Sequence, residues 1–527
     1  MKITLLLIFT TTLSLASFAQ VSTTILDEND MGVTLSDGGV FFSEYEGDTV
    51  FSNTTSMYLP GCESPKGSGK FVMQGLSLWF AGEDFYGVPH LSTPVNNAYT
   101  QQFSGPLSLL YGEPSPYGGW TGSLFPVTQQ EIDDHIANYS NSGYVIPESI
   151  LNWPAHGRVD LGMDFNLAPF VDVNGNGAYE PENGDFPCIK GDKAVYIISN
   201  DVKIHSDCGV GSGWNLESLG IEIHYMFYQY SSINGLENTT FCKARVINRT
   251  TTTYTNFKSS LLMKGQIGNY SDDYSGTDVT RNLIYTYNGD ATDESGTYSI
   301  GYDNSPPATG VVSLNHAISR SRLLNDGLTY INFAPTYPPD FWNIMNGNLL
   351  DGTPHPDIFT YTGNPYLGTG IVENGGPNYQ KDMVYTIDIG DLNPAEEIEF
   401  DFAVVIGQGS NNLESVNELF NSVDFVQSFY NNDTEGCHQE ILSTDNPIEL
   451  KGISTYPNPS NGIFSLKVDE NLIGARFFIA DIGGRIIVPV QLINNSESKI
   501  TLDQAPGAYL INITNDFSTA TYKIIIE

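Results

Sequence analysis

The residues best suited to chemistry lie in one stretch, FVDVNGNGAYEPENGDFP, which runs from residue 170 to residue 187. Asp172, Asn174 and Asn176 alternate along it as the first, third and fifth positions of a calcium loop do, and a glycine follows where such a loop turns sharply. Ala178 can add its carbonyl oxygen. Calcium takes six to eight hard oxygen ligands, so the pattern predicts a structural calcium site. Glu180 or Asp185 would supply the remaining carboxylate.

The pattern departs from an EF-hand in two respects. Asn183 occupies the position where an EF-hand has its bidentate glutamate, and no helical pattern flanks the loop. The stretch is closer to the helix-free DxNxNG loops of secreted modules. A turn built on Asn and Gly without any metal is the alternative.

A second acidic stretch, NYSDDYSGTD, carries Asp272, Asp273 and Asp278. These carboxylates are candidates for a second calcium site, and a solvated acidic turn is the simpler interpretation.

Signatures of catalysis are missing from the sequence. It contains no HExxH, GxSxG, Walker A or CxxC motif. His205 and His224 lie in or beside expected strands, where a packing role is the simpler interpretation. Cys62 or Cys242 beside a histidine would make a nucleophile pair, but cysteines of exported chains are more often bridged. A glycosidase needs only two carboxylates, and 61 acidic residues leave that alternative open.

The charge balance excludes some partners. The chain has 22 basic and 61 acidic residues, a formal net charge of −39. Such a chain repels nucleic acid and anionic membranes and attracts cations. Five cysteines (Cys62, Cys188, Cys208, Cys242 and Cys437) do not decide their own pairing, and their odd number leaves at least one unpaired within the chain.

The N-terminus predicts export. Lys2 precedes an apolar run that ends in Ser17-Phe18-Ala19, so we expect a signal peptide over residues 1–19, cleaved between Ala19 and Gln20. No later segment approaches 18 consecutive apolar residues, so we expect no transmembrane segment in the mature chain.

Hydrophobic periodicity predicts a mainly β protein. Residues 221–227 and 398–406 alternate apolar and other side chains as half-buried strands do. Thr128 and Glu131 predict a capping box that opens a helix over 129–139, with Val127 and Ile132 as its hydrophobic staple. A second helix is expected over 412–430, because Leu413, Val416, Leu419, Val423 and Val426 recur at helical spacing.

These elements predict β-sandwich regions with a few helices, followed by a small immunoglobulin-like antiparallel β-sandwich. The expected division is an N-terminal β-rich region with one helix (20–160), a central β-sandwich region with the calcium-type loop (161–436), a linker (437–452) and a terminal domain (453–527). Short strands separated by turns over the last 75 residues support the terminal sandwich.

The terminal segment carries an ordered set of landmarks. They are Tyr456-Pro457-Asn458-Pro459, then Gly462, Gly484-Arg485, Gly507 with Tyr509, and finally Lys523-Ile524-Ile525. This order resembles the type A C-terminal sorting domain of the type IX (Por) secretion system of Bacteroidota. The resemblance implies that the terminal sandwich directs the chain across the outer membrane. It also implies that a sortase-like peptidase removes it, leaving the cargo released or attached to the cell surface.

The middle of the chain, roughly 150–410, resembles large uncharacterised secreted proteins of Bacteroidota that contain a DxNxNG loop. That resemblance implies a β-rich architecture and no particular reaction. The expected function is therefore that of a secreted or surface protein engaged in non-catalytic adhesion or glycan binding and stabilised by calcium. The alternatives are a secreted hydrolase acting on polysaccharide and a structural extracellular matrix protein. The expected partners are the secretion machinery, its peptidase and surface glycans, with no nucleic acid.

Overall fold

The computed structural model describes most of the chain. The described residues are 22–46, 57–94, 102–109, 115–116, 124–202, 218–231, 233–296, 299–325, 335, 338–375, 380–433, 453–469, 472–481, 486–502, 504–514 and 519–527. The expected signal peptide, its cleavage site and the expected linker lie outside these residues. No helix in the described part of the chain is long and apolar enough to span a bilayer.

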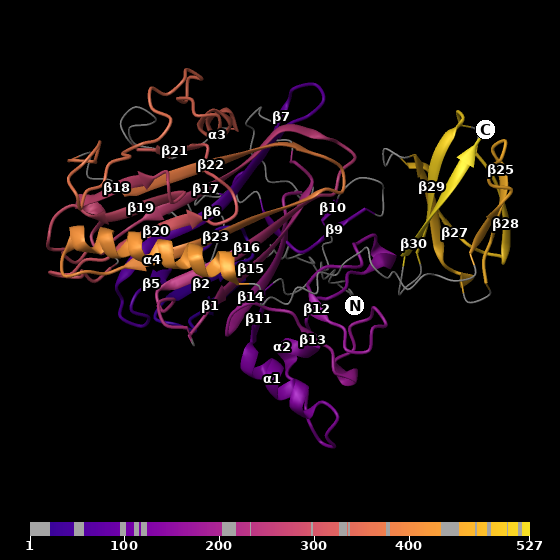
Figure 1. Ribbon diagram of the computed structural model, residues 1–527, viewed down its shortest axis with the longest axis horizontal. Coiled ribbons are helices and arrows are strands. Elements are labelled where there is room, and N and C mark those ends of the chain that lie inside the picture. The colour runs from indigo at the N-terminus through magenta and orange to yellow at the C-terminus, as the bar shows by residue number, and fades with distance from the viewer. Residues whose placement is uncertain are drawn as a thin grey trace, which may run out of the picture.

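Two antiparallel sheets form a large sandwich (Figure 1). The first sheet has the order β1 (Thr23–Leu26), β2 (Gly32–Ser36), β5 (Cys62–Glu63), β6 (Phe71–Glu83), β17 (Tyr254–Gly265), β22 (Lys381–Leu392) and β21 (Arg320–Leu323), with β7 (Pro89–Ser92) paired to β6. The second has the order β11 (Leu124–Thr128), β14 (Lys193–Asn200), β15 (Ile221–Gln229), β16 (Thr239–Asn248), β23 (Glu397–Gly407), β20 (Ala308–Ser313), β19 (Leu283–Asn288) and β18 (Asp273–Asp278), with β8 (Phe103–Ser104) paired to β14.

The main core lies between these two sheets. The predicted alternation is confirmed in β15 and β23: Ile223, Tyr225 and Phe227 from one strand and Phe402 and Val404 from the other all lie in this core. Alternate residues of a strand point to the same face, so a period of two places a whole apolar row against the opposite sheet.

Helices cover the outer faces of both sheets. Helix α4 (Asn412–Asn432) crosses the outer face of the second sheet (Figure 1), and α3 (Pro338–Met345) packs on the outer face of the first. Both predicted helices are confirmed. In α4 the predicted residues Val416, Leu419, Val423 and Val426 are buried, whereas Leu413 in its first turn is exposed.

The first helix, α1 (Gln129–Asn138), has the capping box that the sequence predicts. The side chain of Thr128 accepts from the backbone N–H of Glu131, and the Glu131 carboxylate accepts from the backbone N–H of Thr128. Beside it lie α2 (Glu148–Leu151) and the 3-10 turn η2 (Pro181–Asn183). Two further 3-10 turns are η1 (Val159–Leu161) and η3 (Tyr270–Asp272), the second of which precedes β18.

Both sheets contain strands from residues 22–160 as well as strands from residues 161–433. Strand β6 lies between β5 and β17, and β11 pairs with β14. Residues from both parts of the chain therefore contribute to a single core in the large sandwich. Three two-stranded ribbons lie outside the large sheets: β3 (Ser43–Glu46) with β4 (Met57–Pro60), β9 (Leu107–Ser108) with β10 (Ser115–Pro116), and β12 (Phe170–Val171) with β13 (Phe186–Pro187).

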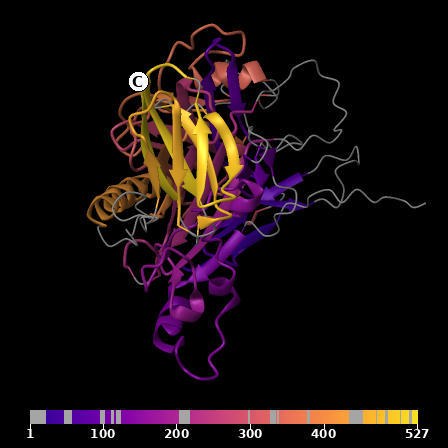
Figure 2. The ribbon, with the colours of Figure 1, turned by 90° about the vertical axis from the view of Figure 1, so that its right-hand side faces the viewer.

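The last strands form the predicted small sandwich (Figure 2). One sheet has the order β24 (Ser454–Tyr456), β25 (Ile463–Lys467) and β28 (Glu497–Thr501); the other has β27 (Ile486–Leu492), β26 (Arg476–Asp481), β29 (Gly507–Thr514) and β30 (Thr519–Ile526). A core of its own, which includes Phe464, Ile479, Ile511 and Ile524, lies between them.

Close packing of α4 on β23 gives a test of the fold. Gly407 lies so near α4 that a Cβ there would overlap the backbone of Leu419. We expect Gly407→Ala to lower the free energy of unfolding by about 1–3 kcal/mol, because backbone atoms cannot rotate away from the new methyl group. Chemical denaturation of the chain from residue 20 to residue 527, which keeps the sorting domain, measures the change.

The matched control is Gly507→Ala, which adds the same methyl group where the nearest atoms are 3.9 Å away. An unchanged unfolding transition in Gly407→Ala would show that α4 does not press on β23.

Candidate functional site

The proline-rich start of the terminal sandwich is joined to its last strand through one side chain. Pro457 and Pro459 have no N–H to offer a neighbouring strand. Asn458 supplies the missing contacts: its Nδ2 donates to the carbonyl of Lys523 at 2.7 Å, and its Oδ1 accepts from the N–H of Ile525 at 2.8 Å. A side-chain amide thus takes the place of a peptide group in the ladder.

The contact continues along the backbone. Ser460 donates to the carbonyl of Ile525 at 2.9 Å and accepts from the N–H of Glu527 at 2.8 Å, in a parallel bridge. The Pro-Asn-Pro corner and the final strand therefore close the sandwich together. Lys523 takes part through its carbonyl while its side chain is exposed.

Other landmarks of the sorting pattern have structural roles here. Gly462 has φ +90°, and a Cβ there would lie 2.6 Å from the carbonyl oxygen of Leu502, so both conformation and space require glycine. The hydroxyl of Tyr456 donates to Glu497 at 2.6 Å, and that of Tyr509 donates to the carbonyl of Ala505 at 2.7 Å. Gly507 begins β29. Gly484 and Arg485 lie outside the described residues.

The calcium-type loop connects β12 to β13, and its oxygens hold its own backbone. Asp172 accepts from the N–H groups of Gly175 and Gly177, at 2.7 and 2.6 Å. Asn174 accepts from the N–H of residue 176 at 3.0 Å, and Asn176 accepts from that of Ala178 at 2.8 Å. These successive turns wind residues 172–178 into a tight, exposed coil.

The two candidate carboxylates that follow have different surroundings. Asp185 is wholly buried and accepts from the N–H groups of Val173 and Glu180 at 2.9 and 2.8 Å, so it ties the two ends of the loop together. Burial raises its pKa. Glu180 instead lies in the loop and accepts from the side-chain amides of three asparagines.

The structure therefore brings Glu180 together with Asn174 and Asn176. Hydrogen bonds from Asn183, Asn176 and Asn174 hold the pKa of Glu180 below its usual value, so this carboxylate is charged at neutral pH. Oxygen donors of this kind suit calcium. Within the described residues, however, no group of three or more His, Cys, Asp or Glu side chains is arranged to hold a metal ion.

The second acidic stretch is divided by the fold. Asp278 accepts from Thr280 and forms an ion pair with Arg281 at 2.6 Å. Asp272 and Asp273 lie at the other end of β18, so the three acids do not form one site.

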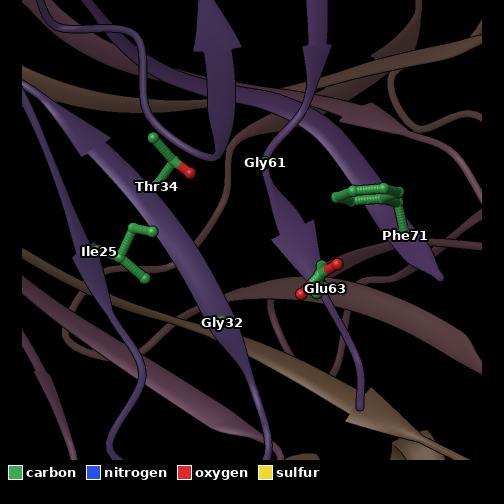
Figure 3. A pocket seen from close by; sticks show the side chains of 6 residues that line it. All are labelled: Ile25, Gly32, Thr34, Gly61, Glu63 and Phe71. Atoms are coloured by element: carbon green, nitrogen blue, oxygen red, sulfur yellow. The ribbon is translucent and has the colours of Figure 1, made fainter. Parts of the chain in front are cut away.

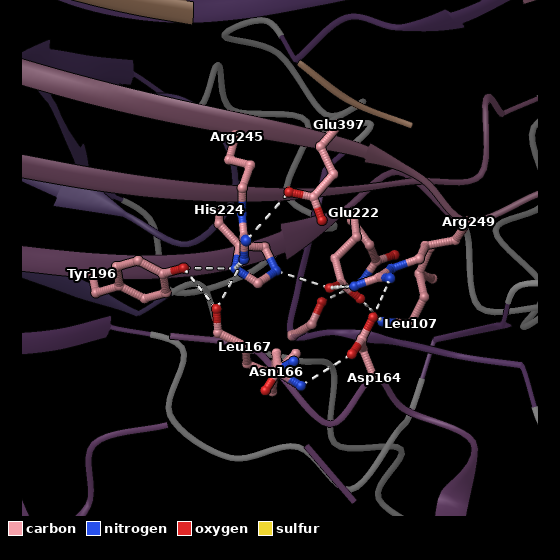
Figure 4. Close-up of polar contacts among 12 residues, drawn as sticks. Leu107, Asp164, Asn166, Leu167, Tyr196, Glu222, His224, Arg245, Arg249 and Glu397 are labelled. Atoms are coloured by element: carbon pink, nitrogen blue, oxygen red, sulfur yellow. Dashed lines mark hydrogen bonds and ion pairs between the residues drawn. The ribbon is translucent and has the colours of Figure 1, made fainter. Parts of the chain in front are cut away.

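A buried charged network on β14, β15 and β16 is a feature that the sequence analysis missed (Figure 4). Glu222 is 0% exposed, and its carboxylate contacts Arg249 and His224, each at 2.8 Å. Its second oxygen accepts from the N–H of Leu107 at 2.7 Å. The available signal was the alternation of polar residues at 222 and 224 within an apolar strand.

The network extends to the segment that covers the sheet. Arg249 pairs with Asp164 at 2.5 Å, and Arg245 donates to the carbonyl of Leu167 at 2.9 Å. The Tyr196 hydroxyl lies 2.7 Å from Nδ1 of His224. Because these polar groups bind one another, the network fastens residues 107 and 164–167 onto the sheet.

Burial sets the charge states in this network. Burial and the guanidinium groups of Arg245 and Arg249 lower the pKa of His224, which leaves the ring neutral at pH 7. Burial by itself raises the pKa of Glu222, but Arg249 and His224 outweigh it and lower that pKa well below its ordinary value. The network thus contains a paired carboxylate that is charged at neutral pH.

Neither the two candidate cysteines nor the pocket described here can serve as an active site. Cys62 and Cys242 are buried thiols whose pKa values burial raises, so neither offers a thiolate nucleophile. A pocket bordered by Ile25, Thr34, Glu63 and Phe71 (Figure 3) encloses about 50 Å³. Pockets for drug-sized ligands enclose about 300–1,000 Å³, so this one cannot hold a sugar ring. His205 lies outside the described residues.

Comparison with known proteins identifies the family of the terminal domain. Residues 454–527 match the family described as a secretion system C-terminal sorting domain. This part of the chain is a type IX sorting domain. The chain is therefore exported by that system to the cell surface or the extracellular space. The predicted resemblance is confirmed for this domain and stays a prediction for the middle of the chain.

No curated protein matches the chain significantly. Similar solved structures include a polysaccharide lyase (10% identity, 58% of this chain and 34% of that one, TM-score 0.17). Others are a putative kojibiose phosphorylase from the human microbiome (9%, 77% and 35%, 0.22) and heparan sulfate lyase HepC from Pedobacter heparinus (10%, 67% and 33%, 0.18). The matches span about a third of each of those chains, and TM-scores this low do not establish a common fold.

The bridge made by Asn458 predicts a defect in the sorting domain. In Asn458→Ala both side-chain hydrogen bonds to β30 are lost, which costs about 1–2 kcal/mol. We expect faster hydrogen exchange at the Ile525 amide in the intact protein, together with less protein at the cell surface and more in the periplasm.

Glu497→Ala is the control, because it removes the exposed contact that Glu497 makes with the Tyr456 hydroxyl and leaves the β30 bridge intact. Normal surface delivery of a chain that lacks residues 453–527 altogether would contradict the sorting role itself.

The buried network predicts a pH-dependent contribution to stability. A carboxyl whose folded pKa is lowered stabilises the fold above its unfolded pKa, about 4.3, and loses that contribution as the pH falls through the folded value. Glu222→Gln leaves Arg249 without a buried partner and should destabilise the fold by about 3–5 kcal/mol at pH 7.

The measurement is the free energy of unfolding between pH 3 and pH 7. The difference between the variant and the wild type should shrink at the acid end. Glu397→Gln, which breaks the more exposed 3.4 Å pair with Arg245, should have a much smaller effect. Equal effects of the two substitutions would contradict the role given to burial.

Proposed function

We propose that the large sandwich acts at the cell surface or outside the cell as a non-catalytic binding module for neutral glycans. The observation that carries this proposal is the tip of the β6–β7 hairpin, where Phe85 is 89% and Tyr86 is 83% exposed. The export of the chain supports it, because an extracellular protein meets polysaccharide.

The tip presents its aromatic rings on an ordered turn. Asp84 accepts from the N–H groups of Tyr86 and Val88, both at 2.8 Å, and its carbonyl accepts from Gly87 at 2.9 Å. The two rings contact each other edge to face, with centroids 5.4 Å apart. In Figure 1 the connection leading into β7 projects past the sheet. These hydrogen bonds leave the backbone of the turn little freedom to lose on binding, which favours affinity.

The chemistry of the tip fits a sugar. Aromatic rings in water offer large apolar faces, and aromatic residues are enriched in binding surfaces for that reason. The apolar C–H face of a pyranose ring can cover such a ring. Glu83 and Asn256 lie at the base of the hairpin, 3.5 Å apart, and can bond sugar hydroxyl groups. The net charge of −39 disfavours polyanionic glycans, so neutral polysaccharide is the expected ligand class.

Calcium is the second part of the proposal. We infer that the loop formed by residues 172–185 binds calcium through Asn174, Asn176, Ala178 and Glu180 with Asp172, while Asp185 holds the ends of the loop. The charged state of Glu180 and the convergence of amide and carboxylate oxygens support this inference. We also propose that a sortase-like peptidase of the secretion machinery removes the sorting domain after export. A hydrolase acting on polysaccharide and a matrix protein remain the alternative functions.

Pull-down of the mature chain on insoluble neutral polysaccharides tests the binding function. Cellulose, xylan and chitin are suitable probes. We expect retention by at least one of them, and at least about tenfold weaker binding by the double variant Phe85→Ser/Tyr86→Ser, which corresponds to about 1.4 kcal/mol. Val145→Ser is the control, because it removes another highly exposed apolar side chain.

The same tubes are assayed for released sugar. Retention without release supports a binding module, and release would instead support the hydrolase. Retention that the double variant leaves unchanged would contradict the role of the hairpin tip.

The calcium loop predicts a metal-dependent thermal midpoint. Calcium at 100 times its dissociation constant stabilises the folded chain by about 2.7 kcal/mol per site, so the midpoint should rise with calcium and fall with chelator. Asp172→Ala should remove the share that belongs to this loop. A full response in that variant would show that the loop is not a calcium site.

A further inference from the structure

Apart from the loop at residues 172–185, a group of acidic side chains lies beside β18 and β19, at one edge of the second sheet. Asp272 ends η3, Asp273 begins β18, and Asp293 follows β19. Asp273 lies directly opposite Asn288 in the β18–β19 register. Asp273 and Asp293 are each 1% exposed and Asn288 is 0% exposed, so these three side chains are closed off from water, whereas Asp272 beside them is half-buried.

Backbone N–H groups donate hydrogen bonds to the carboxylates of Asp273 and Asp293. Oδ2 of Asp273 accepts from the N–H of Ile267 at 2.8 Å. The two oxygens of Asp293 accept from the N–H groups of Asn269 and Tyr302, at 3.0 and 2.7 Å. The turn after β17 and the loop after β19 are thereby held against each other.

Three buried oxygens in this group have no hydrogen-bond partner among the described residues. They are Oδ1 of Asp272, Oδ1 of Asp273 and Oδ1 of Asn288. All three are acceptors, and two belong to residues that face each other across a strand pair. A buried oxygen without a partner is costly, so acceptors placed like these call for a proton, a bound water or a cation.

No positive side chain neutralises the acids. None of the ion pairs described in the structure includes Asp272, Asp273 or Asp293. The ammonium group of Lys381 acts on Asp273, but it is itself paired with Glu373 at 2.6 Å. Burial raises the pKa of Asp293 to about 6 and that of Asp273 well above its ordinary value. Ionised, these groups repel one another.

Two glycines let the acid-bearing turns approach this closely. Gly268 has φ +46°, and a Cβ there would overlap the Asp293 carboxylate. A Cβ on Gly289 would overlap the carbonyl oxygen of Asp272. A larger residue at either position would push the acid-bearing turns apart. The two glycines therefore allow the carboxylates to lie close together.

We propose that this cluster binds a calcium ion through Asp272, Asp273 and Asp293, with the amide oxygen of Asn288 as a neutral ligand. An all-oxygen set that contains several carboxylates suits a hard divalent cation. The carboxylates of Asp273 and Asp293 are turned toward backbone N–H groups, and as they stand the acids are not arranged to hold a metal ion, like every such group in the described part of the chain. Binding therefore requires small rotations of Asp272 and Asp273. The ion would join the turn after β17 to the loop after β19.

This site is independent of the loop at residues 172–185 and of glycan binding. It also differs from the sequence hypothesis, which included Asp278. That residue is paired with Arg281 at the opposite end of β18. Asp293, which is distant in sequence from the SDD segment, takes its place.

The experiment uses the mature full-length chain carrying Asp172→Ala, so that the first loop does not contribute. Its thermal midpoint is measured in chelator and in a calcium chloride titration. We expect the midpoint to rise by several degrees with calcium. Adding Asp273→Asn should raise the midpoint in chelator, because a repelling charge is removed, and should abolish the response to calcium. Asp293→Asn provides a second variant with the same expected result.

Asp278→Asn in the same background is the matched control and should retain the full calcium response. A chain carrying Asp172→Ala alone that does not respond to calcium overturns the proposal and leaves a proton or a bound water as the partner of these oxygens. A full response in both Asp273→Asn and Asp293→Asn would also overturn it. Neither result depends on whether the chain binds polysaccharide.

Discussion

Burial of the two large sheets against each other is the constraint on which the rest of the structure depends. Both outer faces are covered as well, by α4 and the segment around α1 and α2 on one side and by α3 on the other. Strand β15 is therefore buried along its whole length. Any polar residue on such a strand must find its partners inside the protein. Glu222 and His224 satisfy this requirement through the network with Arg249.

The same constraint explains why the acid cluster at β18 is unusual. The buried charges of the Glu222 network have partners of opposite sign, whereas Asp273 and Asp293 face further oxygens. Both groups lie on strands or turns that the sandwich holds in place, so neither can relax outward into water. The two groups differ because different residues lie next to their acids. Asp273 lies opposite Asn288 in the strand register, whereas Glu222 lies beside arginines.

The sorting domain depends on a smaller and separate core. Its first segment gives up backbone donors at two prolines, and Asn458 restores the contact with the last strand. The start and the end of the domain are consequently joined, which makes the domain a closed unit that the secretion machinery can handle apart from its cargo. In the large sandwich, the exposed side chains of Phe85 and Tyr86 lie on a turn rather than within a strand.

The sequence by itself determined the features that depend on local order. The period of two in β15 and β23 and the capping box at Thr128 are readable from neighbouring residues, and the structure confirms them. The order of landmarks in the terminal segment likewise predicts the sorting domain, which the family match over residues 454–527 confirms. The exposed position of Leu413 shows the limit of this reasoning, because the helical period does not say where a helix first meets the sheet.

Only the tertiary structure decided which distant residues meet. Strand β6 pairs with β17 across 170 residues of chain, Glu222 meets Asp164 through Arg249, and Asp293 replaces Asp278 beside Asp273. Such contacts follow from sheet order and register, and a shift of register by one residue would turn each side chain to the opposite face. Local patterns do not contain that information, because register is set by the packing of whole sheets.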